Sequence, residues 1–289
     1  MYGYFIDRLK AEKLDIYAME IYCGGETIYH YDVGKAERYP IYSVTKSITS
    51  AAFSIACAEG ILTAETPLSE LLPGRYKKIM GRDFSRMPFK RFLTMTAGEY
   101  PFRPYGDDWL ETCLSINADF SDTSFHYSNI PAYFVSAALE NAVGEPLIKY
   151  LGSRLFEPLG IPDPPYAKSP EGYFYGATGM SLSVSELAKL GILYLENGIC
   201  SGRVIIPSEQ IDEAVAGHIT TNRGDGYGYF FRAADDHFSM VGKWGQRCII
   251  YPKQKLVIAY LSHQPDRSEE LYAAVNDFAR SVTAPHTSL

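Results

Sequence analysis

Strand-like segments lie at both ends of this chain, and helix-like segments fill the long stretch between them. Residues 14–22 (LDIYAMEIY) alternate in the manner of a strand, and residues 26–31 do so again after a Gly24-Gly25 turn signal. Because short links join the strands at each end, an antiparallel sheet fits better than a parallel one. Strand-like text returns near the other end at residues 227–232, 238–243, 247–251 and 256–261.

The middle of the chain predicts helices. Residues 43–59 begin with a hydroxyl, contain many alanines and stop at Gly60, which are helix start and stop signals. We therefore predict an α/β (α+β) fold, in which an antiparallel sheet from both termini is flanked by helices and carries an inserted, mostly helical lobe. A cleft is expected where two such lobes meet. Further helices are predicted at residues 2–13, 131–142, 146–156, 183–197, 207–216 and 268–282.

Charge and cysteine content exclude several classes of partner. Lys and Arg total 27 against 34 Asp and Glu, for a net charge of −7, and no basic block occurs, so neither nucleic acid nor an anionic membrane is expected to bind. The five cysteines are odd in number and none has CxxC spacing, which argues against a structural zinc site or disulfide framework. Residues 1–15 lack the apolar core of a secretory signal, and the apolar stretch 51–58 is too short to span a bilayer. We expect a cytoplasmic protein.

A serine and a lysine stand three residues apart at the start of the predicted helix 43–59, as Ser43-Val44-Thr45-Lys46. Residues with this spacing share one face of a helix, so the ammonium of Lys46 can reach the hydroxyl of Ser43. The positive end of the helix dipole would favour a neutral Lys46 that takes the Ser43 proton. The alternative is that Ser43 is only an N-cap and Lys46 a surface lysine.

Two further elements are candidates for the same site. Tyr127 and Asn129 stand two residues apart in the loop before the predicted helix 131–142, where they could project towards one point. Gly242-Lys243-Trp244 closes a predicted strand, and a glycine there lets a backbone N–H approach a ligand and complete an oxyanion hole with the N–H of Ser43. Taken singly, a Tyr-x-Asn sequence is common in turns, and Gly242-Lys243-Trp244 could be an ordinary hairpin turn.

Together, the three elements resemble the serine β-lactamase and penicillin-binding-protein superfamily. The likeness is closest to its class C-like branch, which includes esterases, D-amino-acid peptidases and 6-aminohexanoate-dimer hydrolases. The order agrees, with S-x-x-K early, Y-x-N 84 residues on (127 − 43), and a glycine-rich strand element near the end. Segments 91–98 (RFLTMTAG), 157–161 (EPLGI) and 176–190 (GATGMSLSVSELAKL) are also similar to the family.

The resemblance implies a role for each motif residue. Ser43 resembles the acylated nucleophile, and Lys46 resembles its proton acceptor. Tyr127 resembles the residue that passes the proton to the leaving group and later activates water, and Asn129 the polar contact that orients Lys46 and the substrate amide. The region of Lys243, with its neighbours Gly242 and Trp244, resembles the oxyanion strand. A single domain over residues 1–289 follows, with a sheet lobe at about 1–42 and 218–289 and a helical lobe at about 43–217.

One departure from the family pattern narrows the function. The usual third motif is Lys or His, then Thr or Ser, then Gly, and no such triplet occurs in the last strands. Trp244 follows Lys243 instead, as in the esterase and amidase relatives. We therefore expect a metal-free and cofactor-free serine hydrolase that acts through an acyl-enzyme on a small-molecule ester or amide. The alternatives are a penicillin-binding protein, a D-alanyl carboxypeptidase or β-lactamase, or a non-catalytic ligand-binding member of the fold.

Overall fold

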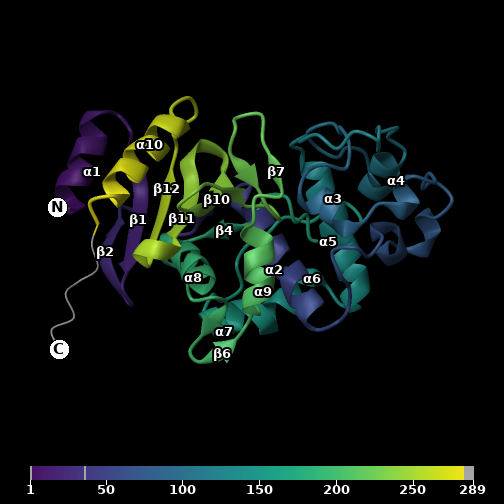
Figure 1. The fold of residues 1–289 in the computed structure, drawn as a ribbon, viewed down its shortest axis with the longest axis horizontal. Helices are drawn as coiled ribbons and strands as arrows, with labels where there is room; N and C mark the ends of the chain where they lie inside the picture. Colours follow the sequence, from purple (N-terminus) through teal and green to yellow (C-terminus); the bar gives the residue numbers. More distant parts are fainter. Residues whose placement is uncertain (1, 36, 283–289) are drawn as a thin grey trace.

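The two ends of the chain build one sheet, as the sequence predicts. The computed structural model describes residues 2–35 and 37–282. Every pair of neighbouring strands in its eight-stranded sheet is antiparallel, and the first strand lies between the second and the last, so that Ile16 pairs with Ser262. Figure 1 shows this as purple strands beside yellow-green ones. In sheet order the strands are β2 (Glu26–Asp32), β1 (Ile16–Cys23), β12 (Leu256–Ser262), β11 (Gln246–Tyr251), β10 (Phe238–Gly242), β9 (Arg232–Ala233), β8 (Gly226–Tyr227) and β7 (Ile219–Thr220).

Helices cover both faces of this sheet. The first and last helices, α1 (Tyr2–Ala11) and α10 (Ser268–Ala279), pack on one face, where the rings of Phe5 and Phe278 stack with centroids 4.0 Å apart. On the other face lies α8 (Val184–Leu195). A Cβ at Gly191 would lie 2.4 Å from the sulfur of Cys248 on β11, so a glycine is needed for α8 to approach this closely.

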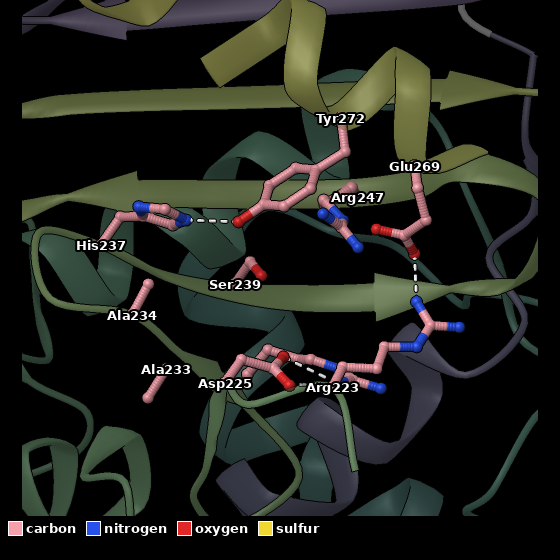
Figure 2. Close-up of a pocket in the computed structure, with 10 residues that line it drawn as sticks. Arg223, Asp225, Ala233, Ala234, His237, Ser239, Arg247, Glu269 and Tyr272 are labelled. Carbon is pink, nitrogen blue, oxygen red and sulfur yellow. Dashed lines mark hydrogen bonds and ion pairs between the residues drawn. The ribbon is translucent and has the colours of Figure 1, made fainter. Parts of the chain in front are cut away.

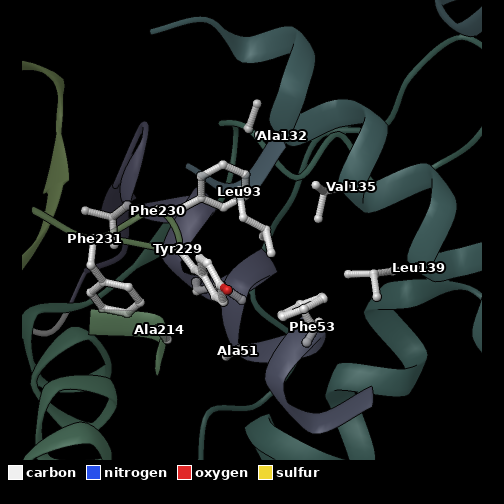
Figure 3. Packing of buried hydrophobic residues seen from close by; sticks show 14 of the residues in the cluster. Ala51, Phe53, Leu93, Ala132, Val135, Leu139, Ala214, Tyr229, Phe230 and Phe231 are labelled. Atoms are coloured by element: carbon white, nitrogen blue, oxygen red, sulfur yellow. The ribbon is translucent and has the colours of Figure 1, made fainter. Parts of the chain in front are cut away.

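One helix, α2 (Val44–Ala58), runs through the centre of the molecule and is buried on nearly all sides. Its alanines and other apolar side chains suit this position, and the buried hydroxyls of Ser47 and Thr49 donate to the carbonyls of Phe230 and Gly176. Figure 3 shows Phe53 of α2 among Leu139, Val135 and Tyr229, which belong to surrounding elements. The helices around α2 include α5 (Asn129–Val143), α6 (Leu147–Leu151), α9 (Ser208–Val215) and α3 (Phe89–Leu93), whose Phe89 ring stacks on Phe53.

Two predicted boundaries differ in the structure. The predicted helix 146–156 is α6 continued by a π-helical turn, and Asn129 is the first residue of α5 rather than part of the preceding loop. No described helix is long and apolar enough to cross a membrane.

The remaining helices and strands are short. They are α4 (Trp109–Leu114), α7 (Glu157–Leu159), the strand pairs β3 (Tyr39–Pro40) with β4 (Ser181–Leu182) and β5 (Ile199–Cys200) with β6 (Arg203–Val204), the π-helical turn Gly152–Phe156, and the 3₁₀ turns Leu68–Leu71, Gly74–Tyr76, Phe84–Arg86, Lys243–Gly245 and Pro252–Gln254.

The fold class is confirmed, but one predicted strand is wrong. Residues 227–232 form the end of β8, a turn and the start of β9 instead of a continuous strand. Within the turn, Phe230 has φ of 62° and its N–H donates to the carbonyl of Leu93, while the N–H of Tyr229 donates to the carbonyl of Ala214. These hydrogen bonds to other elements replace a strand ladder, and the buried rings of the turn produce the strand-like pattern.

Candidate active site

Ser43 and Lys46 meet at the N-terminal end of α2. Lys46 donates a hydrogen bond from Nζ to Ser43 Oγ, at 3.2 Å, as expected for side chains three residues apart on a helix. Ser43 makes no capping hydrogen bond with its side chain, and Lys46 is only 1% exposed. Ser43 does occupy the N-cap position of α2, but Lys46 is not a surface lysine, so the alternative interpretation is wrong on that point.

The ammonium of Lys46 has an oxygen acceptor for each of its three N–H groups. Besides Ser43 Oγ, it donates to Asn129 Oδ1 at 2.6 Å and to the carbonyl of Ala177 at 2.9 Å. Asn129 is aimed at it because α5 begins there, directly after Ser128 caps the helix by accepting from the N–H of Ile130. The three acceptors fix the amine before any substrate arrives.

Burial lowers the pKa of Lys46, because a charged amine loses its water shell there. The neighbouring Tyr127 acts in the opposite direction and partly offsets this effect. The Lys46 nitrogen lies 4.9 Å from the centroid of the Tyr127 ring. A lysine whose pKa is lowered in this way is able to accept a proton from a neighbouring hydroxyl.

Tyr127 stands at the mouth of the site, 36% exposed, among other rings. Its centroid lies 6.4 to 6.5 Å from those of Phe102, Phe125 and Tyr227. Burial raises the pKa of Tyr227 well above its ordinary value, so this neighbour stays neutral. Tyr127 thus has an apolar surround on one side and the buried Lys46 on the other.

The third motif reaches the serine through a close backbone contact. A Cβ on Gly242 would lie 2.3 Å from the carbonyl oxygen of Ile41, so only glycine lets the end of β10 lie against the segment before Ser43. Beyond it, Trp244 has φ of 64°, and its ring meets that of Tyr42, which has φ of 47°, edge to face at 5.1 Å. Left-handed backbone at two non-glycine residues is unusual and is often found at functional sites.

These residues line one cleft of about 780 Å³. Ser43, Tyr127 and Asn129 open onto it from the helical side, and Gly242, Lys243 and Trp244 from the sheet side, while Lys46 lies buried behind Ser43. The amine of Lys243 folds over the Trp244 ring, 4.3 Å from its centroid. The lining also includes Phe102, Arg103, Phe125, Tyr175, Thr178, Thr221, Arg223, Arg232, Arg247 and Glu269.

The most important contact that sequence reasoning missed is the carbonyl of Ala177. Gly176 and Gly179, both with positive φ, bracket Ala177 and Thr178. A Cβ on Gly176 would lie 2.5 Å from Ser136 on α5, so the segment is pressed into the core and its carbonyl is held at Lys46. The paired glycines of the GATG sequence were the sequence signal for this contact.

Within the described part of the chain, no group of three His, Cys, Asp or Glu side chains is placed to hold a metal ion.

Comparison with known proteins agrees with this geometry. The family model described as Beta-lactamase matches residues 10–280. The chain belongs to the beta-lactamase family. The resemblance inferred from the motifs is thereby confirmed, and this beta-lactamase-family chain has the mixed fold and large antiparallel sheet of its structural relatives.

Solved structures of several proteins share the fold of this beta-lactamase-family chain. A Bacillus anthracis protein assigned as a 6-aminohexanoate-dimer hydrolase is 18% identical, with a TM-score of 0.75 over 95% of this chain and 81% of that one. A penicillin-binding protein homologue from Caulobacter crescentus is 16% identical, with a TM-score of 0.76 over 95% and 96%. An octameric penicillin-binding protein homologue from Pyrococcus abyssi is 18% identical, with a TM-score of 0.69 over 100% and 78%. No curated protein matches the sequence.

Proposed function

We propose that this chain is a serine hydrolase that cleaves a small-molecule ester or amide through an acyl-enzyme on Ser43. The observation that carries the proposal is the contact between Ser43 Oγ and the buried amine of Lys46 at the floor of the cleft. A serine hydroxyl is a weak nucleophile until a neighbouring base removes its proton. Lys46 suits that task because burial lowers its pKa.

In the acylation step, Ser43 Oγ attacks the carbonyl carbon while its proton passes to neutral Lys46. The carbonyl π electrons move to oxygen, where the backbone N–H of Ser43 and one from the third-motif segment hold the oxyanion. As the tetrahedral intermediate collapses, the bond to the leaving group breaks and Tyr127 passes a proton to that group. The nearness of Tyr127 to Lys46 supports a relay between them.

In the deacylation step, water attacks the acyl carbon and gives one proton to Lys46 by way of Tyr127. The bond between the acyl carbon and Ser43 Oγ then breaks, Oγ takes that proton from Lys46, and the acid product leaves. Asn129 holds Lys46 in place through the 2.6 Å hydrogen bond and also contacts the substrate amide. The reaction needs no metal, cofactor or nucleic acid. All five cysteines are free, which supports placing it in a reducing compartment such as the cytoplasm.

The test is a panel of short-chain esters, D-amino-acid amides and nitrocefin, run on the wild type, Ser43→Ala and Ser50→Ala. Ser50 is the matched control because it lies on the same helix, fully buried, with a hydroxyl that has no hydrogen-bond partner among the described residues. We expect Ser43→Ala to lose at least about 10³-fold in kcat for the substrates that are cleaved, and Ser50→Ala to keep wild-type rates.

Mass spectrometry separates the alternatives. A fluorophosphonate or β-lactam adduct on Ser43, absent from Ser43→Ala, supports the acyl-enzyme. Rapid acylation without turnover would instead identify a non-catalytic sensor of the same fold. Full turnover by Ser43→Ala rules out the proposed nucleophile.

A further inference from the structure

A smaller cavity of about 200 Å³ opens beside the cleft, on the α10 side of the sheet (Figure 2). We call it the side pocket. Its walls include Ser239 of β10, Arg247 of β11 and Tyr272 of α10. Arg223, Arg232, Arg247 and Glu269 line both the side pocket and the cleft that holds Ser43, so the two cavities are neighbours with a shared wall.

Arg247 is buried in this wall without an anionic partner. It is 7% exposed, and its guanidinium makes no ion pair or hydrogen bond within residues 2–35 and 37–282. Its guanidinium stacks on the ring of Tyr272, whose centroid lies 3.6 Å from the guanidinium carbon. Figure 2 shows the guanidinium pointing into the pocket between Tyr272 and Glu269.

The other charged groups facing the pocket are already paired. Arg223 bonds Glu269 at 2.6 Å, and Arg232 bonds Asp225 at 2.7 Å. The polar groups of His237 and Tyr272 also have partners: His237 Nε2 contacts the Tyr272 hydroxyl at 2.6 Å, and His237 Nδ1 contacts the Asp236 carboxylate at 2.6 Å. Arg247 therefore leaves the pocket with one uncompensated positive charge.

A hydroxyl donor faces the same space. Ser239 is 2% exposed, lines the pocket, and its side chain makes no hydrogen bond within the described residues. A buried cation without an anion is energetically costly, and stacking on a tyrosine ring offsets only part of that cost. A guanidinium and a hydroxyl that point into one small cavity match a carboxylate, which accepts two hydrogen bonds from arginine side by side.

We propose that the side pocket binds a carboxylate or similar small monoanion, with Arg247 as its anchor and Ser239 as a second donor, and that this anion is a substituent of the substrate. The substrate class is then an ester or amide with a negative charge away from the scissile carbonyl, which rests on the proposed function. The Arg223–Glu269 pair stands at the shared wall, with side chains 64% and 57% exposed. Such exposed pairs are weak, so a substituent entering there displaces little.

The kinetic test uses two pairs of esters that differ in one charge. On the acyl side, mono-p-nitrophenyl glutarate is compared with p-nitrophenyl valerate, and on the leaving-group side 4-acetoxybenzoate with 4-acetoxybenzamide. The wild type is expected to prefer the anionic member of at least one pair by about tenfold or more in kcat/KM, and Arg247→Met to lower that preference by about tenfold or more. Arg247→Lys restores part of it, because it restores the charge.

Two controls separate recognition from folding. Arg203→Met, on the exposed strand β6, carries the same substitution far from the pocket lining and keeps the wild-type preference. Ser239→Ala is a smaller change inside the pocket and lowers the preference several-fold, about what one hydrogen bond to a charge contributes. An equal loss on charged and neutral esters in Arg247→Met, with no recovery in Arg247→Lys, overturns the proposal.

Equilibrium binding distinguishes failure of the pocket from failure of the hydrolase. Glutarate and inorganic phosphate are titrated calorimetrically into the wild type and Arg247→Met. If no ester and no amide is cleaved, the proposed function fails, and Arg247-dependent binding of glutarate still supports the anion site. Binding that is equal in both proteins overturns the site. Arg247-dependent glutarate binding without any preference among cleaved esters overturns the substrate subsite, because the ligand is then a free anion.

Discussion

Two buried cationic side chains border the same cleft, and they differ in their hydrogen-bond acceptors. Lys46 has three oxygen acceptors from three separate segments, at Ser43, Asn129 and Ala177. Arg247 has a tyrosine ring and no acceptor within the described chain. The first network is complete without a ligand, as a site that must be rigid for chemistry requires. The second is incomplete, as a site that waits for a charged group would be.

The largest difference is expected from making the same substitution at both cations. Lys46→Met removes the proposed base and should lower kcat/KM by about 10³-fold or more. It also leaves Asn129 Oδ1 and the Ala177 carbonyl without a donor, so the free energy of unfolding should fall by about 1 to 3 kcal/mol. Ester hydrolysis and urea denaturation measure the two effects. A Lys46→Met variant with wild-type activity and stability would contradict the proposed difference between Lys46 and Arg247.

A smaller effect is expected when one acceptor is removed from the complete network. Asn129 Oδ1 bonds the charged amine, so Asn129→Ala should favour neutral Lys46 and lower its pKa further. The wild-type rate should rise with pH as Lys46 loses its proton and reach its plateau below 10.5, the ordinary pKa of lysine. In Asn129→Ala the rise of the rate with pH should move to lower pH. The plateau rate should fall about tenfold, because Lys46 is held less well in position. A rise at or above pH 10.5 in the wild type would contradict a neutral base.

The smallest effect is expected at the incomplete site. Arg247→Met leaves no acceptor without a donor and removes a buried, unpaired charge. In a buffer free of carboxylates and phosphate, its free energy of unfolding should therefore lie within about 1 kcal/mol of the wild type. Urea denaturation with Arg203→Met as control measures this. A loss like that of Lys46→Met would mean that Arg247 has a partner that holds the fold together.

The sequence predicts those parts of the fold and site whose cause is local. Helix α2 lies within a residue of its predicted ends because a hydroxyl, a run of alanines and a glycine mark them. The Ser43–Lys46 contact follows from helical spacing alone. Contacts made by backbone atoms from distant segments leave little trace in side-chain identity, and the acceptor at Ala177 is of this kind. The isolation of Arg247 is also not local, because it depends on which side chains α10 brings over β11.

The same reasoning explains the predicted strand that is absent. Residues 227–232 have the ring-rich composition of a strand. The backbone N–H groups of Tyr229 and Phe230, however, donate hydrogen bonds to the carbonyls of Ala214 and Leu93 and not to a neighbouring strand. Pattern alone does not distinguish a buried turn from a buried strand, since both place apolar side chains in the core.

The pairing of β1 with β12 has a consequence for how the protein is made. During synthesis, Ile16 leaves the ribosome 246 residues (262 − 16) before its partner Ser262. Until then β1 and β2 form only a two-stranded hairpin, which is marginally stable by itself in water. The helical region, with its shorter-range contacts, is available to fold first. The eight-stranded sheet is thus completed only after β12 appears, and a chain that stops before β12 presents an unpaired, apolar strand edge that favours aggregation.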